Sequence, residues 1–312
     1  MVRKRIVRDT VSHLASHSST SASMASSVLQ SYGKHCVRVS KIKRLDVGQP
    51  NESHDFFEAS VDIELQGDFA AAYLDGDNRL VVATDTCRNT VYVLAKDDPI
   101  DSLESFGCTI ATHFLNQYSH IELATVTLRQ QIWHRMFASP HGFMGNDSET
   151  PTATVVAKRV GKQHHLSVTS GITDCVIAKT TESGFANFHQ DAFRTLPDTA
   201  DRILATSLTA SWSYSSDSLG NYNEYREAIR TQLLETFLDH YSRSAQETLY
   251  LMATAAIARC NEIETISLTM PNKHHIRFDL EPFGRTNDND VFVVTDEPFG
   301  FITATINKSD QK

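Results

Sequence analysis

The chain has 312 residues, of which 40% are hydrophobic, and a formal net charge of −9, so it can bury the core of one large domain or two ordinary ones. The acidic balance argues against nucleic acid as a partner, because neutralising phosphates requires a basic face, while one arginine in a pocket can still bind a small anion locally. No stretch reaches the ~20 apolar residues of a membrane-spanning helix, so we expect no membrane partner.

Residues 1–30 differ in composition from the rest of the chain. They carry four basic residues, many serines and a single acidic residue, Asp9. This bias is typical of a transit peptide, but chain ends commonly lack order unless they are pinned to the fold. We therefore predict a disordered N-terminal extension over residues 1–30.

The first half of the chain predicts strands around one long helix. Residues 57–65 alternate apolar and polar side chains, which is typical of a strand with one buried face. Residues 36–42 predict its partner strand, and residues 43–55 connect the two. A helix is expected over residues 104–118 and a further strand over residues 121–128. Such strands favour an antiparallel sheet that is covered on one side.

The second half repeats this order, with extended segments before two helices. The extended segments are expected over residues 152–157, 165–169 and 174–178. In the first helix, apolar or aromatic residues recur at every fourth position and predict a buried stripe: Tyr225, Ile229, Leu233, Phe237 and Tyr241.

The second helix has a clear start signal. Residues 244–247 form a capping box, in which the Ser244 hydroxyl accepts from the Glu247 N–H and the Glu247 carboxylate reciprocates. The alternation that follows, over residues 266–270, predicts a strand that Pro271 ends. Alternation resumes at Ile276, so we expect a hairpin with residues 272–275 as its loop.

Turn-forming residues cluster at positions 145–151, between the two halves. We predict a first domain over residues 31–148, a second domain over residues 149–306 and a C-terminal tail over residues 307–312. The halves share an order of elements but no residue-by-residue identity.

The five cysteines are dispersed along the chain without a Cys-x-x-Cys pair. This pattern favours free thiols in a reducing compartment over disulfides or a zinc site. We expect a cytoplasmic protein; a peroxisomal one is the alternative, although the last residues lack Ser-Lys-Leu. Gly-x-Gly-x-x-Gly, Walker-type and Gly-x-Ser-x-Gly motifs do not occur. No organic cofactor and no metal ion is therefore expected.

Four polar motifs stand along the chain: Tyr32-Gly33-Lys34, Ala83-Thr84-Asp85-Thr86, Asp201-Arg202-Ile203-Leu204 and Pro271-Asn272-Lys273-His274. In order and spacing they resemble the signatures of the uricase (urate oxidase) family, and the resemblance extends from about Tyr32 to Ile306. One such motif is weak evidence, whereas four in register are specific.

The resemblance implies an α+β fold class with two tunnelling-fold domains per chain, in which antiparallel sheets carry helices on one face. Four chains would form a barrel around a central tunnel. It also implies an oxidoreductase of purine breakdown, which oxidises urate with O2 and water to 5-hydroxyisourate and hydrogen peroxide without a cofactor. The partners implied are urate, molecular oxygen and the other chains of a homotetramer, with active sites at the subunit interfaces.

The resemblance assigns a set of substrate-binding residues. Arg202 matches the arginine that grips the urate edge, and its planar fork suits adjacent oxygen and nitrogen acceptors. Gln246 matches the glutamine on the opposite edge. The Ala245 N–H lies beside it in the first helical turn, where free N–H groups and the helix dipole favour an anion. Phe185 matches the ring that stacks on the purine, whereas Phe188 is expected in the core.

The resemblance also assigns a proton relay to Lys34, Thr84 and His274. A lysine can act as a base, a threonine hydroxyl can pass a proton, and histidine titrates near neutrality. Asn272 matches the asparagine that holds oxygen or a water molecule. Thr84 and Asp85 are expected to reach urate from a neighbouring subunit.

Other interpretations remain open. Each of these residues by itself has a structural explanation, such as a helix cap, a core ring or a turn. A zinc-dependent tunnelling-fold enzyme acting on a pterin or guanine-type ring is one alternative, and a non-catalytic purine-binding homologue is another. Locally, Arg88 stands where the family has lysine. Residues 91–93 favour a strand by propensity, whereas the resemblance predicts a helix that starts near Thr84.

Overall fold

The computed structural model describes residues 30–44, 53–215 and 220–310. Residues 1–29 of the expected N-terminal extension lie outside the described residues, as do the last two positions of the expected tail. The described part of that tail contains the end of the last strand and a short 3-10 helix, η3 (Lys308–Asp310).

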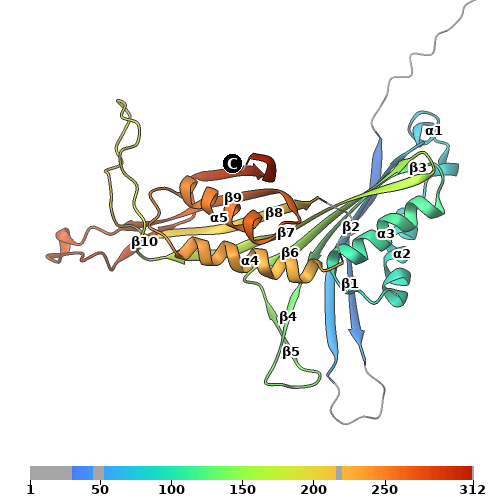
Figure 1. Ribbon diagram of the computed structural model, residues 1–312, viewed down its shortest axis with the longest axis horizontal. Coiled ribbons are helices and arrows are strands. Elements are labelled where there is room, and N and C mark those ends of the chain that lie inside the picture. Colours follow the sequence, from blue (N-terminus) through green and yellow to red (C-terminus); the bar gives the residue numbers. More distant parts are fainter. Residues whose placement is uncertain (1–29, 45–52, 216–219, 311–312) are drawn as a thin grey trace, which may run out of the picture.

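One antiparallel sheet of nine strands runs through both halves of the described chain (Figure 1). The strand order is β1-β2-β3-β6-β7-β8-β9-β10, and β11 also pairs with β9. The bounds are β1 Ser31–Lys43, β2 Asp55–Gly67, β3 Ile121–Gln130, β6 Thr150–Val160, β7 Gln163–Lys179, β8 Leu204–Tyr214, β9 Ile263–Arg277, β10 Phe292–Thr295 and β11 Phe301–Asn307. A separate hairpin of β4 (Ile132–Arg135) and β5 (Phe143–Asn146) projects from the sheet.

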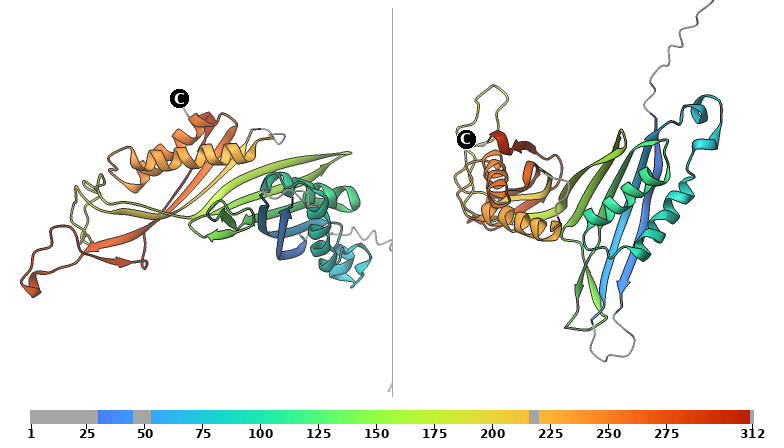
Figure 2. Two further views of the ribbon diagram at one scale, coloured as in Figure 1. Left: turned by 90° about the horizontal axis from the view of Figure 1, so that it is seen from below. Right: turned by 45° about the vertical axis from the view of Figure 1, so that its right-hand side comes forward.

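Four long helices lie on the sheet in two pairs (Figure 2). The first pair is α2 (Thr84–Asp97) and α3 (Leu103–Gln117), and the second is α4 (Tyr222–Leu238) and α5 (Ala245–Arg259). The shorter helices are α1 (Ala70–Leu74), η1 (Asn78–Leu80) and η2 (Glu281–Phe283). The first pair covers the β1 end of a long, twisted sheet and the second covers the region of β7 to β9, so that α3 and α4 meet between them.

The helices cover the same face of the sheet throughout. Two rows of paired residues that are each at most 1% exposed mark this face: Ile63, Val126 and Val155 across β2, β3 and β6, and Ile172, Ala210 and Leu268 across β7, β8 and β9. Burial of such apolar surface is the main favourable term in folding. The predicted α+β class, with antiparallel strands and helices on one face, is therefore confirmed. The division at residues 148 and 149 stays a prediction.

Most of the predicted elements are present. Residues 36–42, 57–65 and 121–128 lie in β1, β2 and β3, and residues 104–118 correspond to α3. The helix at Thr84, which contradicts local strand propensity, is also confirmed. Its buried side chains are Cys87, Thr90, Val91 and Ala95, a helical spacing that lets one face of α2 pack on the sheet.

The prediction that Pro271 ends a strand is wrong. β9 continues through it, and Pro271 lies opposite Phe301 of β11. On the side of β8, Thr269 and Asn272 are paired but the two residues between them are not. The missing proline N–H therefore falls in a gap in the pairing of β9 with β8. Residues 272–275 are consequently strand residues that pair with β8 and β10, and no hairpin loop occurs there.

Three smaller expectations also need correction. The two segments at 165–169 and 174–178 form one strand, β7, with an irregularity between Ile172 and Cys175. Tyr241 lies beyond the end of α4 and is 45% exposed. Only one of the two hydrogen bonds of the predicted capping box is present. The Ser244 hydroxyl accepts from the Glu247 N–H, but the Glu247 carboxylate accepts from the N–H of Arg243 and not from that of Ser244.

A buried polar network joins the two helix pairs. Glu104 of α3 is fully buried and forms an ion pair with Arg226 of α4. The Ser170 hydroxyl donates to the same carboxylate oxygen, and the Tyr214 hydroxyl donates to Ser170 at 2.8 Å. Because a buried charge without its partner is costly, this network fixes how α3 and α4 meet.

Candidate active site

Arg202 lies in the long connection between β7 and β8. Its N–H donates to the Ser183 carbonyl at 2.8 Å, and its Nε lies 3.4 Å from the Ser183 hydroxyl. Burial lowers the pKa of the Arg202 guanidinium. Within the described ranges no carboxylate forms an ion pair with it. A partly desolvated cation without an anionic partner favours an anionic ligand.

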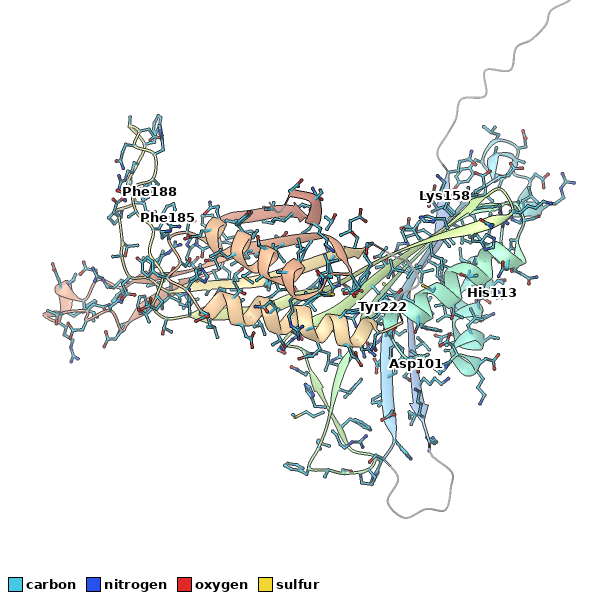
Figure 3. All side chains as sticks on the ribbon, viewed as in Figure 1. Asp101, His113, Lys158, Phe185, Phe188 and Tyr222 are labelled. Atoms are coloured by element: carbon cyan, nitrogen blue, oxygen red, sulfur yellow. The ribbon has the colours of Figure 1, made fainter. Side chains whose placement is uncertain are left out.

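An aromatic platform lies beside this guanidinium. The Arg202 Cζ is 5.3 Å from the centroid of the Phe185 ring, and Phe185 is fixed by two backbone hydrogen bonds to Thr199. Phe188 stacks on Phe185 with 4.7 Å between centroids and 10° between ring planes. Figure 3 shows both rings in the projecting loop at one end of the molecule. The expectation that Phe188 belongs to the core is therefore wrong, because the ring is half-buried and packs on Phe185.

The loop carrying Phe185 is joined to the start of α5. Ser183 and Ser242 form a bridge, and the Gly184 N–H donates to the Ser242 carbonyl at 2.8 Å. A Cβ on Gly184 would lie 2.2 Å from the Tyr241 hydroxyl and 2.9 Å from the Thr199 carbonyl oxygen, so a larger residue would displace these groups. The Ser242 hydroxyl then donates to the Ser244 carbonyl at the N-cap of α5.

The first turn of α5 completes this group. Ala245 is buried and Gln246 is exposed. The Ser244 side chain accepts from Glu247, so the N–H groups of Ala245 and Gln246 have no hydrogen-bond partner among the residues of the described ranges. These N–H groups and the positive end of the helix dipole favour a negatively charged ligand.

Asn272 and His274 lie in β9, the strand next to β8 in the sheet. Their side chains are in contact, with 3.2 Å between Asn272 Nδ2 and His274 Nδ1. Asn272 pairs with Thr206 of β8, the strand that begins two residues after Arg202. The fold therefore places six predicted substrate-binding or relay residues at one end of the sheet: Phe185, Arg202, Ala245, Gln246, Asn272 and His274.

The other three predicted residues lie at the opposite end. Thr84 and Asp85 are exposed in the first turn of α2, and Asp85 forms a 2.8 Å ion pair with Arg88. Thr84 is not the N-cap, because that position is Ala83. Lys34 of β1 lies close enough to α2 for its charge to affect the thiol of Cys87. Burial raises the pKa of this thiol to about 11, and the Lys34 charge opposes the shift.

One chain does not bring the two groups together. β1 and β9 are six steps apart in the strand order, and at about 4.8 Å per step this is roughly 29 Å along the sheet. Figures 1 and 2 show α2 and the loop beyond β7 at opposite ends of the molecule. No side chain spans such a distance, so a site containing all nine residues requires two chains.

Sequence reasoning missed the buried hydroxyls that hold this region together. Ser183, Ser242 and Thr248 are each fully buried, and the Thr248 hydroxyl donates to Ser242 at 2.7 Å. None of the three lies in one of the four motifs that the sequence singled out. In the described part of the chain, no group of three or more His, Cys, Asp or Glu residues could hold a metal ion. No helix there is long and apolar enough to cross a membrane.

Comparison with known proteins gives one consistent result. The sequence model of the Uricase family matches residues 30–156 and 168–303. The chain is 38% identical to "Uricase" of Dictyostelium discoideum over 295 residues, which cover 93% of this chain and all of that protein. It is 36% identical to "Uricase" of Arthrobacter globiformis, with 90% of this chain and 89% of that protein covered.

Solved structures agree with the sequence comparison. The crystal structure of uricase from Arthrobacter globiformis superposes with a TM-score of 0.85 at 35% identity, covering 91% of this chain and 96% of that one. The structure of Bacillus sp. TB-90 urate oxidase gives a TM-score of 0.80 at 23% identity, with 90% and 100% covered, and shares the fold. On its sequence motifs, its fold and these matches, the chain belongs to the uricase family.

Proposed function

We propose that this protein is a urate oxidase, which converts urate, O2 and water to 5-hydroxyisourate and hydrogen peroxide. Urate gains one oxygen atom in this reaction, and O2 accepts two electrons and two protons. The observation that carries the proposal is the Arg202 guanidinium, which lies beside Phe185 without a carboxylate partner among the described residues. A flat anion fits a site that offers an aromatic face and an unpaired cation.

Each residue of this end of the sheet has a task in binding. The Arg202 fork grips one edge of the purine, and the Gln246 side chain with the Ala245 N–H holds the other. Phe185 stacks on the ring and sets its plane, which leaves the opposite face for O2. Asn272 holds the oxygen or a water molecule over that face. Holding the reactants in this geometry reduces the entropy cost of their reaction.

Proton transfer is assigned to Lys34, Thr84 and His274. Loss of protons from urate makes the ring more electron-rich, so that it can give electrons to O2. The Thr84 hydroxyl passes a proton between the purine and Lys34, and His274 exchanges protons on the oxygen side. Asp85 acts with Thr84 at the edge of the substrate.

A complete site requires association of chains. Because Lys34 and Thr84 lie roughly 29 Å along the sheet from Asn272 and His274, we propose that two chains of a homotetramer meet at each active site. The two ends then come from different subunits. We also propose a cytoplasmic location, since all five cysteines are free thiols.

The test is a direct assay of the reaction. Purified protein, first treated with a chelator, is mixed with urate. Urate loss is followed by ultraviolet absorbance, together with oxygen uptake and peroxide formation. Equal amounts of urate lost and peroxide formed support the proposal. Strict dependence on added copper, zinc or flavin contradicts the cofactor-free reaction, and binding of urate without oxygen uptake supports the non-catalytic alternative.

A further inference from the structure

Lys34 lies on a face of β1 that regular alternation would not give it. Val37 faces the helices and is 3% exposed. Residues three positions apart in a regular strand point to opposite faces. Yet Lys34 pairs with the buried Ile63, and Val37 pairs with the buried Val61, so both lie on the helix side. An extra residue between them must have changed the register.

The extra residue forms a β-bulge. The pairing of β1 with β2 shifts between Lys34 and Val37, so that His35 and Cys36 lie opposite the single residue Asp62. Cys36 has a φ of 57°, a left-handed conformation that residues other than glycine adopt infrequently. A bulge of this kind reverses which face the preceding residues occupy. Here it turns Lys34 toward α2.

The bulge is held by the carboxylate of Asp62. The Cys36 N–H donates to Asp62 Oδ1 at 2.7 Å, and Arg129 of β3 forms a 2.6 Å ion pair with Oδ2. His35 lies 3.8 Å from the same carboxylate. Burial by itself raises the pKa of the Asp62 carboxyl, but the Cys36 N–H and Arg129 outweigh it and hold that pKa below its usual value. The carboxylate is therefore charged at neutral pH, when its hydrogen bonds are strongest.

We propose that Asp62 is a positioning residue for catalysis, which fixes the Cys36 bulge and so keeps the Lys34 amine on the α2 side of the sheet, near Thr84. This inference rests on the proposed role of Lys34 in the oxidation of urate. Asp62 itself lies on the opposite face of β2 from Ile63 and does not touch the reacting atoms.

The chain offers a matched control for this carboxylate. Glu58 lies on the same face of β2 and forms a cross-strand ion pair with Arg38 of β1, but the pairing is regular there. Replacing Glu58 by alanine removes an equivalent charge pair and leaves the bulge intact. It tests whether any loss of a carboxylate between β1 and β2 affects turnover.

The expected result is a specific loss of turnover. Asp62→Ala lowers kcat about tenfold, as expected for loss of one charge-assisted hydrogen bond, and changes KM little. Asp62→Asn, which keeps an acceptor oxygen, recovers most of the rate, and Glu58→Ala retains the wild-type rate. In a Lys34→Met background, Asp62→Ala causes no further loss, because residues that act through one group are not additive.

A second pair of variants tests the bulge from the other strand, in case Asp62→Ala does not fold. Cys36→Gly relieves a positive φ and retains turnover, whereas Cys36→Val, with a β-branched side chain, strains the bulge and lowers kcat. Wild-type kcat in both Asp62→Ala and Cys36→Val, together with a lowered but measurable kcat in Lys34→Met, overturns the positioning inference and leaves the role of Lys34 standing. Wild-type kcat in Lys34→Met overturns both.

Discussion

Replacing Arg202 by alanine removes the cation on which the binding proposal depends. The guanidinium is partly desolvated, lies 5.3 Å from the Phe185 ring centroid and has no ion pair among the described residues. One hydrogen bond to a charged group contributes ~1.5–3 kcal/mol, so a bidentate contact of Arg202 with urate contributes about 3–6 kcal/mol to the free energy of binding. At ~1.4 kcal/mol per tenfold change, the dissociation constant should rise roughly 10²- to 10⁴-fold.

The assay is a titration of urate into protein by calorimetry without oxygen, which separates binding from oxidation. Arg259 is the matched control, because it is an exposed arginine in the last turn of α5, at the other end of the helix from Ala245 and Gln246. Arg259→Ala should leave the dissociation constant unchanged. If Arg202→Ala and Arg259→Ala bind urate equally well, the guanidinium does not hold the substrate and the site is elsewhere.

Three further predictions follow from the same structure. Thr84→Ala should lower kcat and leave KM within about threefold, because a proton relay contributes only to the transition state; equal changes in both constants, measured by steady-state kinetics, would contradict the relay. Glu104→Ala should destabilise the fold by about 3–5 kcal/mol, because it leaves the buried Arg226 charge without its ion-pair partner. A fall in the free energy of unfolding of less than ~1 kcal/mol, measured by denaturant unfolding, would count against this role of the network. Burial raises the pKa of the Cys87 thiol to about 11, so the stability linked to this neutral thiol is present at neutral pH and is lost as the pH rises toward that value. At pH 8 iodoacetamide should therefore label the exposed Cys36 before the buried Cys87, and the reverse order by mass spectrometry would refute it.

Much of the fold could be predicted from local sequence. The alternation in β2 and the serine cap of α5 each depend on interactions within a few residues, so the sequence contains the whole signal. α2 could not be assigned in this way, because residues 91–93 favour a strand and only packing on the sheet selects the helix. Tyr241 continued the four-residue spacing of α4, but its hydroxyl donates to the Ala200 carbonyl at 2.7 Å outside the helix.

The candidate site shows the same division. The motifs supplied the residue types, and the capping box by itself predicted free N–H groups at Ala245 and Gln246. The sequence could not reveal that these residues form two groups at opposite ends of a sheet, because strand order is decided by contacts between distant segments. Nor could it reveal the buried residues Ser183 and Ser242, whose backbones form the β-bridge that joins the loop to the start of α5.

By itself, the sequence determined the family, because four motifs occur in the right order and spacing. It also determined the principal strands and helices and the chemical types of the candidate residues, since these depend on neighbouring positions. Only the tertiary structure decided that β9 continues through Pro271, where a gap in pairing tolerates the missing N–H. It also decided which way Lys34 points. In a regular strand successive side chains alternate between the two faces, so position along the chain decides the face. A bulge, here stabilised by a carboxylate on the next strand, adds one residue and reverses that alternation.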